Sequence, residues 1–189
     1  MNMSIMVNPY HTLHTVSTEF LFDEIPFGYR TLESFEHDLI HLMIHSRGMG
    51  LAANQIGITK RFFAMGHESF DVFQKPAIIY NPILVNADEE QELGQEGCLS
   101  FPGLLLQVNR SKIIMVRYQN SKGEFLLSRL EGLEARCFQH ELDHLNGVLY
   151  FNRANRYHKE VAMKKWKRGD FSTIKVNPLG EYYEHLLPR

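Results

Sequence analysis

The stretch QHELDH, residues 139–144, contains two histidines four positions apart, with a glutamate directly after the first. On an α-helix, positions i and i+4 lie one above the other about 6 Å apart, so His140 and His144 can bind one metal ion. Glu141 lies one position further round, where its carboxylate can take a proton from water without becoming a ligand. The pattern is typical of a metal-dependent hydrolase. A chain with ten histidines and many glutamates can also contain it by chance.

A catalytic metal of this kind takes three protein ligands and keeps one open position. Tyr150 stands where a longer metallopeptidase motif, HExxHxxGxxH, has its third histidine, which disfavours that class. In a second class of metallopeptidase, a glutamate downstream of the motif is the third ligand. Glu160 lies at a suitable distance along the chain, but in a lysine-rich stretch that is typical of a solvent-facing surface. The third candidate is Cys98 in GQEGCLSFPG, a glycine-flanked loop that can bring a thiolate to the helix. One thiolate with two imidazoles would accept Fe(II), Zn(II), Ni(II) or Co(II).

Two further groups of possible metal ligands are interpreted as having no part in a metal site. Cys137 shares the face of both histidines, but seven positions at about 1.5 Å rise place it roughly 10 Å from His144, so one ion cannot bridge them. We interpret Cys137 as a packed thiol beside the site. The histidines His37, His41 and His45 lie on the helix predicted over residues 31–47, on the face opposite its apolar stripe. No acidic residue there is placed to activate water. They are interpreted as exposed surface histidines.

These side chains must be positioned by a mixture of helices and strands. An amphipathic helix is predicted over residues 31–47, with Thr31 as N-cap and Gly48 as its stop, and a second helix over 133–146 carries QHELDH and ends at Gly147. Runs rich in β-branched, aromatic or leucine residues predict strands at 61–67, 77–87, 104–110, 112–120 and 124–132. A basic helix is expected at about 155–168, and the tail 170–189 is unassigned. We expect a single α+β domain over residues 1–189.

Composition excludes several classes of protein. With 189 residues, 44% hydrophobic and 22% charged, the chain can bury one sizeable core. A formal net charge of −2 creates no overall attraction to DNA or to a membrane surface. The chain has no apolar run near the length of a spanning helix, and its first residues lack the features of a signal peptide. We therefore expect a cytoplasmic protein with no DNA or membrane partner.

Three stretches occur in a specific order: GMGLAANQIG at 48–57, EGCLS at 96–100 and QHELDH at 139–144. Together they resemble the three signature motifs of the peptide deformylases, in the bacterial-type branch, and the likeness runs from about residue 32 to 151. The resemblance implies short antiparallel sheets around a central metal-binding helix. It also implies an enzyme of protein biosynthesis that removes the formyl group from the N-terminal methionine of nascent polypeptides and releases formate.

The resemblance also implies roles for residues at matching positions. One divalent metal, natively Fe(II) with Ni, Co or Zn as substitutes, would be held by Cys98, His140 and His144. Glu141 would take a proton from the attacking water and deliver it to the departing amine. The Gln55 side-chain amide and the Leu99 backbone N–H would donate to the oxygen that becomes negative in the transition state.

The same resemblance implies how an N-formylmethionyl peptide binds. Gly50 has no side chain, so the peptide can lie against the backbone like an added strand. The methionine pocket would comprise Met49, Glu96, Gly97, Leu133 and Cys137, with Arg136 at a wall position where some members carry an aliphatic residue. A pair of Glu96 with Arg110 would brace the cysteine loop. Ribosome contact is possible through the basic helix, at Lys159, Lys164, Lys165, Lys167 and Arg168.

Two other functions remain as alternatives on the sequence alone. One is a zinc endopeptidase that uses Glu160 as the third ligand. The other is a non-catalytic metal-binding protein. Glu141 and Gln55 disfavour the second alternative, because a structural metal site needs neither an acid–base group nor an oxyanion donor.

Overall fold

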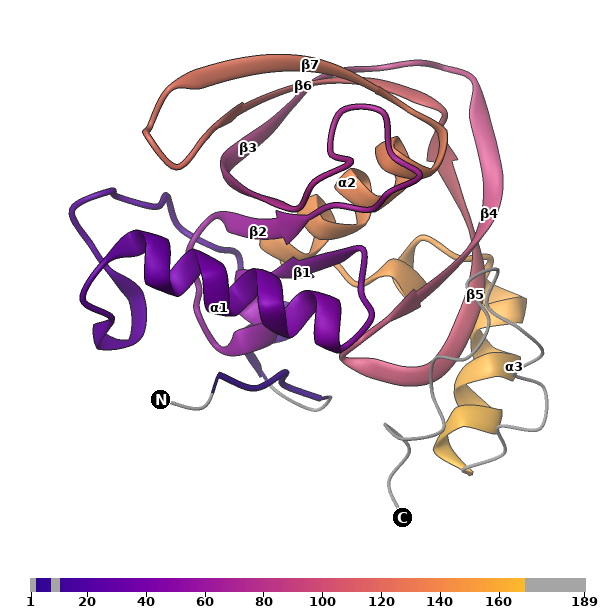
Figure 1. The fold of residues 1–189 in the computed structure, drawn as a ribbon. Coiled ribbons are helices and arrows are strands. Elements are labelled where there is room, and N and C mark those ends of the chain that lie inside the picture. The colour runs from indigo at the N-terminus through magenta and orange to yellow at the C-terminus, as the bar shows by residue number, and fades with distance from the viewer. Residues whose placement is uncertain (1–2, 8–10, 169–189) are drawn as a thin grey trace.

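The computed structural model describes residues 3–7 and 11–168, and this part of the chain contains three α-helices and seven β-strands (Figure 1). The helices are α1 Leu32–His45, α2 Gly132–Leu145 and α3 Arg156–Lys167. The strands are β1 Gly50–Ala52, β2 Phe62–Met65, β3 Ala77–Ala87, β4 Gln91–Cys98, β5 Phe101–Ser111, β6 Ile113–Gln119 and β7 Phe125–Glu131.

The strands form two antiparallel sheets that surround α2. One sheet has the order β1-β2-β3-β6-β7, and β4 pairs with β5 in the other. Figure 1 shows α2 in the centre of the molecule, with α1 across β1 and β2 and α3 beside β5. The predicted α+β architecture, with antiparallel sheets around a central helix, is confirmed.

Helix α1 forms where its apolar stripe predicts it. The Thr31 side chain caps the helix by accepting a hydrogen bond from the Ser34 N–H, and Phe35, Leu39 and Met43 are buried against the sheet. Burial of each such side chain contributes about 1.5–3 kcal/mol. The helix ends at His45, and the left-handed residue that follows is Arg47 (φ 57) rather than the predicted stop Gly48.

The three histidines of α1 lie on its solvent-facing side. His37, His41 and His45 are all exposed, and their rings stack along the helix with centroids 6.3 and 6.0 Å apart. The interpretation of this row as surface histidines agrees with their exposure.

Sequence patterns missed two strands, the three-residue β1 and the longer β4. Strand β4 is the more informative of the two. Its sequence QELGQEGC is polar and lacks β-branched residues, so its propensity for a strand is low. Pairing with β5 from Gln91↔Ser111 to Cys98↔Phe101 nevertheless holds it extended. Cys98 is therefore the last residue of a strand, not part of the predicted loop, and Leu99 and Ser100 form the tight connection to β5.

Helix α2 is buried along almost its whole length, including its charged residues. It is flanked by two glycines in the left-handed region, Gly132 (φ 60) at its start and Gly147 (φ 68) just after its end, as predicted for Gly147. A side chain at Gly147 would collide with the backbone of His14, so close packing as well as the turn requires glycine there. The end of the helix therefore packs closely against the segment that contains His14.

The apolar residues form two clusters. The larger one joins α1, the five-stranded sheet and α2. The smaller one joins β5, the segment 149–151 and α3, where the Trp166 indole N–H donates to the Pro102 carbonyl at 2.7 Å. The predicted tail 170–189 lies outside the described residues. No helix in the described ranges combines the length and apolar character that crossing a bilayer requires.

Candidate metal centre

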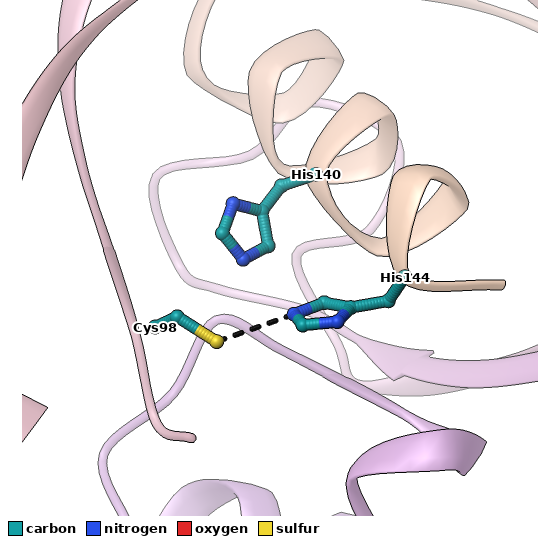
Figure 2. Close-up of side chains that lie close together, drawn as sticks. All are labelled: Cys98, His140 and His144. Atoms are coloured by element: carbon teal, nitrogen blue, oxygen red, sulfur yellow. Dashed lines mark hydrogen bonds between the residues drawn. The ribbon is translucent and has the colours of Figure 1, made fainter. Parts of the chain in front are cut away.

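The ligand atoms of Cys98, His140 and His144 converge, and all lie within 4.8 Å of one another. Figure 2 shows both imidazoles projecting from successive turns of α2 toward the thiol at the end of β4. The Cys98 Sγ lies 3.2 Å from the His144 Nε2, and all three side chains are buried. Within residues 3–7 and 11–168, no other group of three His, Cys, Asp or Glu side chains is placed to hold a metal ion.

Glu160, the alternative third ligand, is not part of this cluster. It lies on α3 with its side chain 64% exposed and pairs with Arg156 at 2.9 Å. Cys137 is buried beside the cluster, where burial raises the pKa of its thiol well above the ordinary value. These positions leave Cys98 as the thiol that meets both histidines.

A buried polar atom and the donor set fit a divalent transition metal. Among the described residues, the buried Glu141 Oε2, beside the cluster, has no hydrogen-bond partner. Leaving such a group without a partner costs about 1–3 kcal/mol. A thiolate with two imidazoles is also a donor set that Fe(II), Zn(II), Ni(II) and Co(II) all accept.

Glu96 orients His140. The His140 Nδ1 lies 3.0 Å from the Glu96 Oε2, and a proton on Nδ1 leaves Nε2 as the atom that faces the cluster. Burial lowers the pKa of His140, but hydrogen bonds to Cys98 and Glu96 outweigh it and raise the pKa well above its ordinary value. Burial and the neighbouring charge of His140 lower the pKa of His144. The two histidines of one motif therefore have opposite electrostatic environments.

Two arginines hold the Glu96 carboxylate in place. Arg110 contacts both oxygens, at 2.9 and 3.0 Å, and Arg136 reaches Oε1 at 2.9 Å. Burial raises the pKa of Glu96, but the hydrogen bonds from His140 and Arg110 prevail and lower it to about 2. The predicted pair of Glu96 with Arg110 is therefore present, and it is buried rather than exposed.

The Arg136 side chain is engaged in hydrogen bonds within the protein, although it lines the pocket wall. Besides Glu96, its guanidinium donates to the backbone carbonyls of Val108 at 2.8 Å and Glu92 at 2.6 Å. Gly94 lies directly against it, so any side chain at that position would collide with the guanidinium. Arg136 thus ties α2 to both strands of the two-stranded sheet.

Glu141 is 4% exposed and lies against β1. Burial raises the pKa of Glu141 to about 7, although the charge of His140 opposes the shift. A carboxyl group with this pKa can both accept and release a proton near neutral pH. A Cβ on Gly50 would collide with the Glu141 carboxylate, so only glycine allows β1 to lie this close.

Gln55 follows β1 in a short 3₁₀ helix, Ala53–Ile56. Its Oε1 accepts a hydrogen bond from the Ala52 N–H at 2.8 Å, which fixes the orientation of the amide. The Nε2 donor consequently faces the Cys98 Sγ at 3.4 Å and the Ser100 Oγ at 3.1 Å. Leu99, in the connection between β4 and β5, is buried beside the same cluster.

A pocket opens beside the cluster. All seven residues predicted to bind substrate line it: Met49, Gly50, Glu96, Gly97, Leu133, Arg136 and Cys137. Four lining residues were not predicted, namely Arg47, Gly48, Gln95 and Leu105. Gly48 is the first residue of the GMG motif, and Arg47 and Gln95 directly precede the GMG and EGC motifs, which is the signal that could have identified them.

The sequence of this chain is similar to a known protein family over most of its length. Residues 3–160 match the profile of the family described as polypeptide deformylase. A peptide deformylase of Thermotoga petrophila is 47% identical over 134 residues, which cover 71% of this chain and 79% of that protein. One from Bartonella henselae is 35% identical over 137 residues, covering 72% and 78%.

Solved structures resemble the fold as well. The crystal structure of peptide deformylase from Thermotoga maritima has a TM-score of 0.71 and 40% identity, covering 80% of this chain and 97% of that one. A peptide deformylase from Synechococcus elongatus in complex with actinonin has a TM-score of 0.77 and 32% identity, covering 88% of both chains.

Proposed function

Because this chain belongs to the peptide deformylase family, we propose that Cys98, His140 and His144 hold its metal and that Glu141 transfers the proton of its reaction. The enzyme is a metal-dependent hydrolase that removes the N-formyl group from N-terminal methionine. The observation that carries the residue assignment is the convergence of one thiol and two imidazoles beside a buried carboxyl group. The endopeptidase alternative is not favoured, because Glu160 is remote and exposed.

The catalytic role of Glu141 rests on its burial and its position. The metal would supply a Lewis acid that makes water nucleophilic near neutral pH. Glu141 accepts the proton that the water loses as its oxygen attacks the formyl carbon. It then donates this proton to the amine nitrogen as the C–N bond breaks, which releases formate and a free N-terminus. Its pKa of about 7 suits both transfers.

The negative charge that develops on the formyl oxygen needs donors that are already oriented. The Gln55 Nε2 is one proposed donor, supported by the hydrogen bond between its Oε1 and the Ala52 N–H. The Leu99 backbone N–H, beside the metal ligand Cys98, is the other. Each such donor contributes on the order of 3 kcal/mol to transition-state stabilisation.

The substrate peptide is proposed to bind as an added strand along β1. Among the described residues, β1 pairs only with β2, so its other edge is available for main-chain hydrogen bonds. Gly50 lies at this edge, in contact with Glu141. The methionine side chain then enters the pocket between Met49, Leu133 and Cys137.

Gly50→Ala should reduce kcat/KM by about 100-fold, because displacement of a catalytic group by about 1 Å has an effect of this size. The added methyl group collides with the Glu141 carboxylate and displaces it. The measurement is formate release at several concentrations of a formyl-methionyl tripeptide. Gly28→Ala is the control, because its methyl group meets nothing within 4 Å, although the positive φ of Gly28 (φ 69) makes alanine less favourable there than at Gly50. Parent-like kcat/KM in Gly50→Ala would contradict this account of Gly50.

Two further parts of the proposal concern the metal and the location. Fe(II) is proposed as the native metal, on the family resemblance and the mixed thiolate and imidazole donors, which also accept Zn(II), Ni(II) and Co(II). The enzyme is proposed to act in the cytoplasm, where formylated nascent chains emerge from the ribosome.

Ribosome contact through α3 is proposed on the basis of exposed charge. Four of its five predicted cations, Lys164, Lys165, Lys167 and Arg168, are exposed. Lys159 is engaged instead, because its Nζ donates to Asn152 and lies 4.9 Å from the Phe151 ring centroid. The exposed group provides a positive surface for RNA phosphates.

Formate release from a formyl-methionyl tripeptide tests the proposed reaction. The protein is loaded with Fe(II) in the absence of oxygen, and formate is measured over time alongside the metal-free protein. We expect rapid release that requires the metal. If the metal-loaded protein releases no formate, the proposed reaction is wrong.

A further inference from the structure

A chain of ion pairs runs from the metal centre to a second cavity of the protein. Glu96 and His140 line the pocket beside the metal centre. The second cavity has none of these lining residues and is lined in part by Arg110, Asp143 and Arg153. The buried pair of Glu96 with Arg110 joins the two. A change in the second cavity can therefore reach His140 through charged groups that contact one another.

The Arg110 guanidinium uses different nitrogens for its two carboxylate partners. Its Nε and Nη2 donate to the two oxygens of Glu96 at 2.9 and 3.0 Å, and its Nη1 donates to the Asp143 Oδ2. A guanidinium is planar and rigid, so a contact that holds Nη1 also holds the edge that faces Glu96. Asp143 therefore helps to place the Glu96 carboxylate, which contacts the His140 Nδ1.

Asp143 also balances the buried charge beside the metal centre. Glu96 contacts two buried arginines, Arg110 and Arg136, and its Oε2 is shared between Arg110 and His140. With Asp143, two buried carboxylates face two buried arginines. A buried charge that loses its partner is costly. Without the charge of Asp143, Arg110 would compete more strongly with His140 for Glu96.

Arg153 holds Asp143 from the outer side. The Arg153 Nη2 donates to the Asp143 Oδ1 at 2.7 Å, and its Nε donates to Oδ2 at 3.2 Å. Arg153 directly follows the 3₁₀ turn Tyr150–Asn152, and its side chain is half-exposed. The Asp143 carboxylate is thus shared between one buried and one half-exposed arginine, and the outer one restrains its orientation.

We propose that Asp143 is a positioning residue for the metal ligand His140, acting through Arg110 and Glu96, and that Arg153 is its outer anchor. This inference rests on the proposed metal site. A histidine ligand binds a metal most tightly when its other ring nitrogen is held by a fixed partner, and here Glu96 is that partner. Displacement of Glu96 should therefore weaken metal binding without removal of any ligand.

The first test measures the Zn(II) affinity of the protein by competition with a chelator. Asp143→Asn should lower this affinity by about 10-fold, the lower end of the effect of changing a residue outside the ligand set. Arg153→Gln should lower it by about two- to fivefold, as expected for a partly exposed ion pair. Arg153→Lys restores the charge and should retain most of the parent affinity. Arg61→Gln is the matched control, because Arg61 lines the same cavity but donates to Asn146 and Pro82.

The second test asks whether Arg153 acts through Asp143. In the Asp143→Asn background, Arg153→Gln should change the Zn(II) affinity no further, because residues that act through one contact are not additive. The absorption bands of bound Co(II), which depend on ligand geometry, should shift in Asp143→Asn but not in Arg61→Gln. The unfolding midpoint of the metal-free protein identifies a variant that fails to fold. If Asp143→Asn does so, the two Arg153 variants carry the test.

The outcomes separate this inference from the proposed metal site. Parent-like Zn(II) affinity in Arg153→Gln would overturn the role of Arg153, and parent-like affinity with an unchanged Co(II) spectrum in folded Asp143→Asn would overturn that of Asp143. An equal loss from Arg153→Gln in the parent and in Asp143→Asn would show that Arg153 does not act through Asp143. Absence of metal binding by the parent would instead reject the proposed metal site.

Discussion

Glu141→Gln should lower kcat for formate release by about 10²–10⁴-fold while the metal content stays at the parent level. Glutamine has nearly the same size as glutamate but cannot accept and return a proton. Because Glu141 is proposed as a proton carrier and not as a ligand, its loss should not release the metal. The measurement combines single-turnover formate release with metal analysis of the same sample.

Glu160→Gln is the matched control for this change. It replaces an exposed carboxylate on α3, outside the metal centre, and should retain parent activity. Under the endopeptidase alternative, Glu160 is a ligand, and this variant would lose both metal and activity. Equal rates for the parent and Glu141→Gln would refute the assignment of proton transfer to Glu141.

Cys98→Ala should lower the metal affinity by at least about 100-fold, because even the loss of a residue that only hydrogen-bonds to a ligand typically lowers affinity 10- to 100-fold. The remaining imidazoles of His140 and His144 supply only two of three ligands. Formate release should therefore fall to background at metal concentrations that saturate the parent. The measurement is metal bound per chain after equilibrium dialysis, with Zn(II) or Ni(II) as oxygen-stable probes.

Thermal unfolding provides a second measurement on Cys98→Ala. A metal that binds only the folded state raises the unfolding midpoint of the parent, and it should raise that of Cys98→Ala much less. Cys137→Ala is the matched control, because it removes the other buried thiol and should retain the metal. Parent-like metal binding by Cys98→Ala would show that the thiol is not a ligand.

Several helices and strands of this protein could be predicted from the residues within each segment. Helix α2 could be predicted because the glycine after its end, Gly147, and its i, i+4 spacing are properties of neighbouring residues, and the same spacing places His140 and His144 on one face. The β6–β7 hairpin was also predictable, because Gly123 (φ 77) and the Asn120 side chain form its turn. Strand β3 was predicted over residues 77–87 and occurs as Ala77–Ala87.

The polar strand β4 could not be predicted in this way. Its residues have little preference for extended structure, and the strand exists because β5, which follows it, supplies the hydrogen bonds. The short strand β1, which begins at Gly50, could not be predicted either, because the GMG motif alone indicates only a turn. Gly50 is required because the Glu141 carboxylate, from a distant part of the chain, occupies the space where a side chain would lie.

The sequence by itself determined the chemical types present: two imidazoles at helical spacing, an adjacent carboxylate and a candidate thiolate in an ordered set of motifs. Only the tertiary structure decided that Cys98 meets His144, 46 residues away, and that one buried carboxylate, Glu96, contacts His140. It also decided the pKa of Glu141, since burial is a property of the packed molecule. The physical reason is that spacing along a helix is set by neighbouring residues, whereas burial, strand pairing and long-range contacts depend on the whole fold.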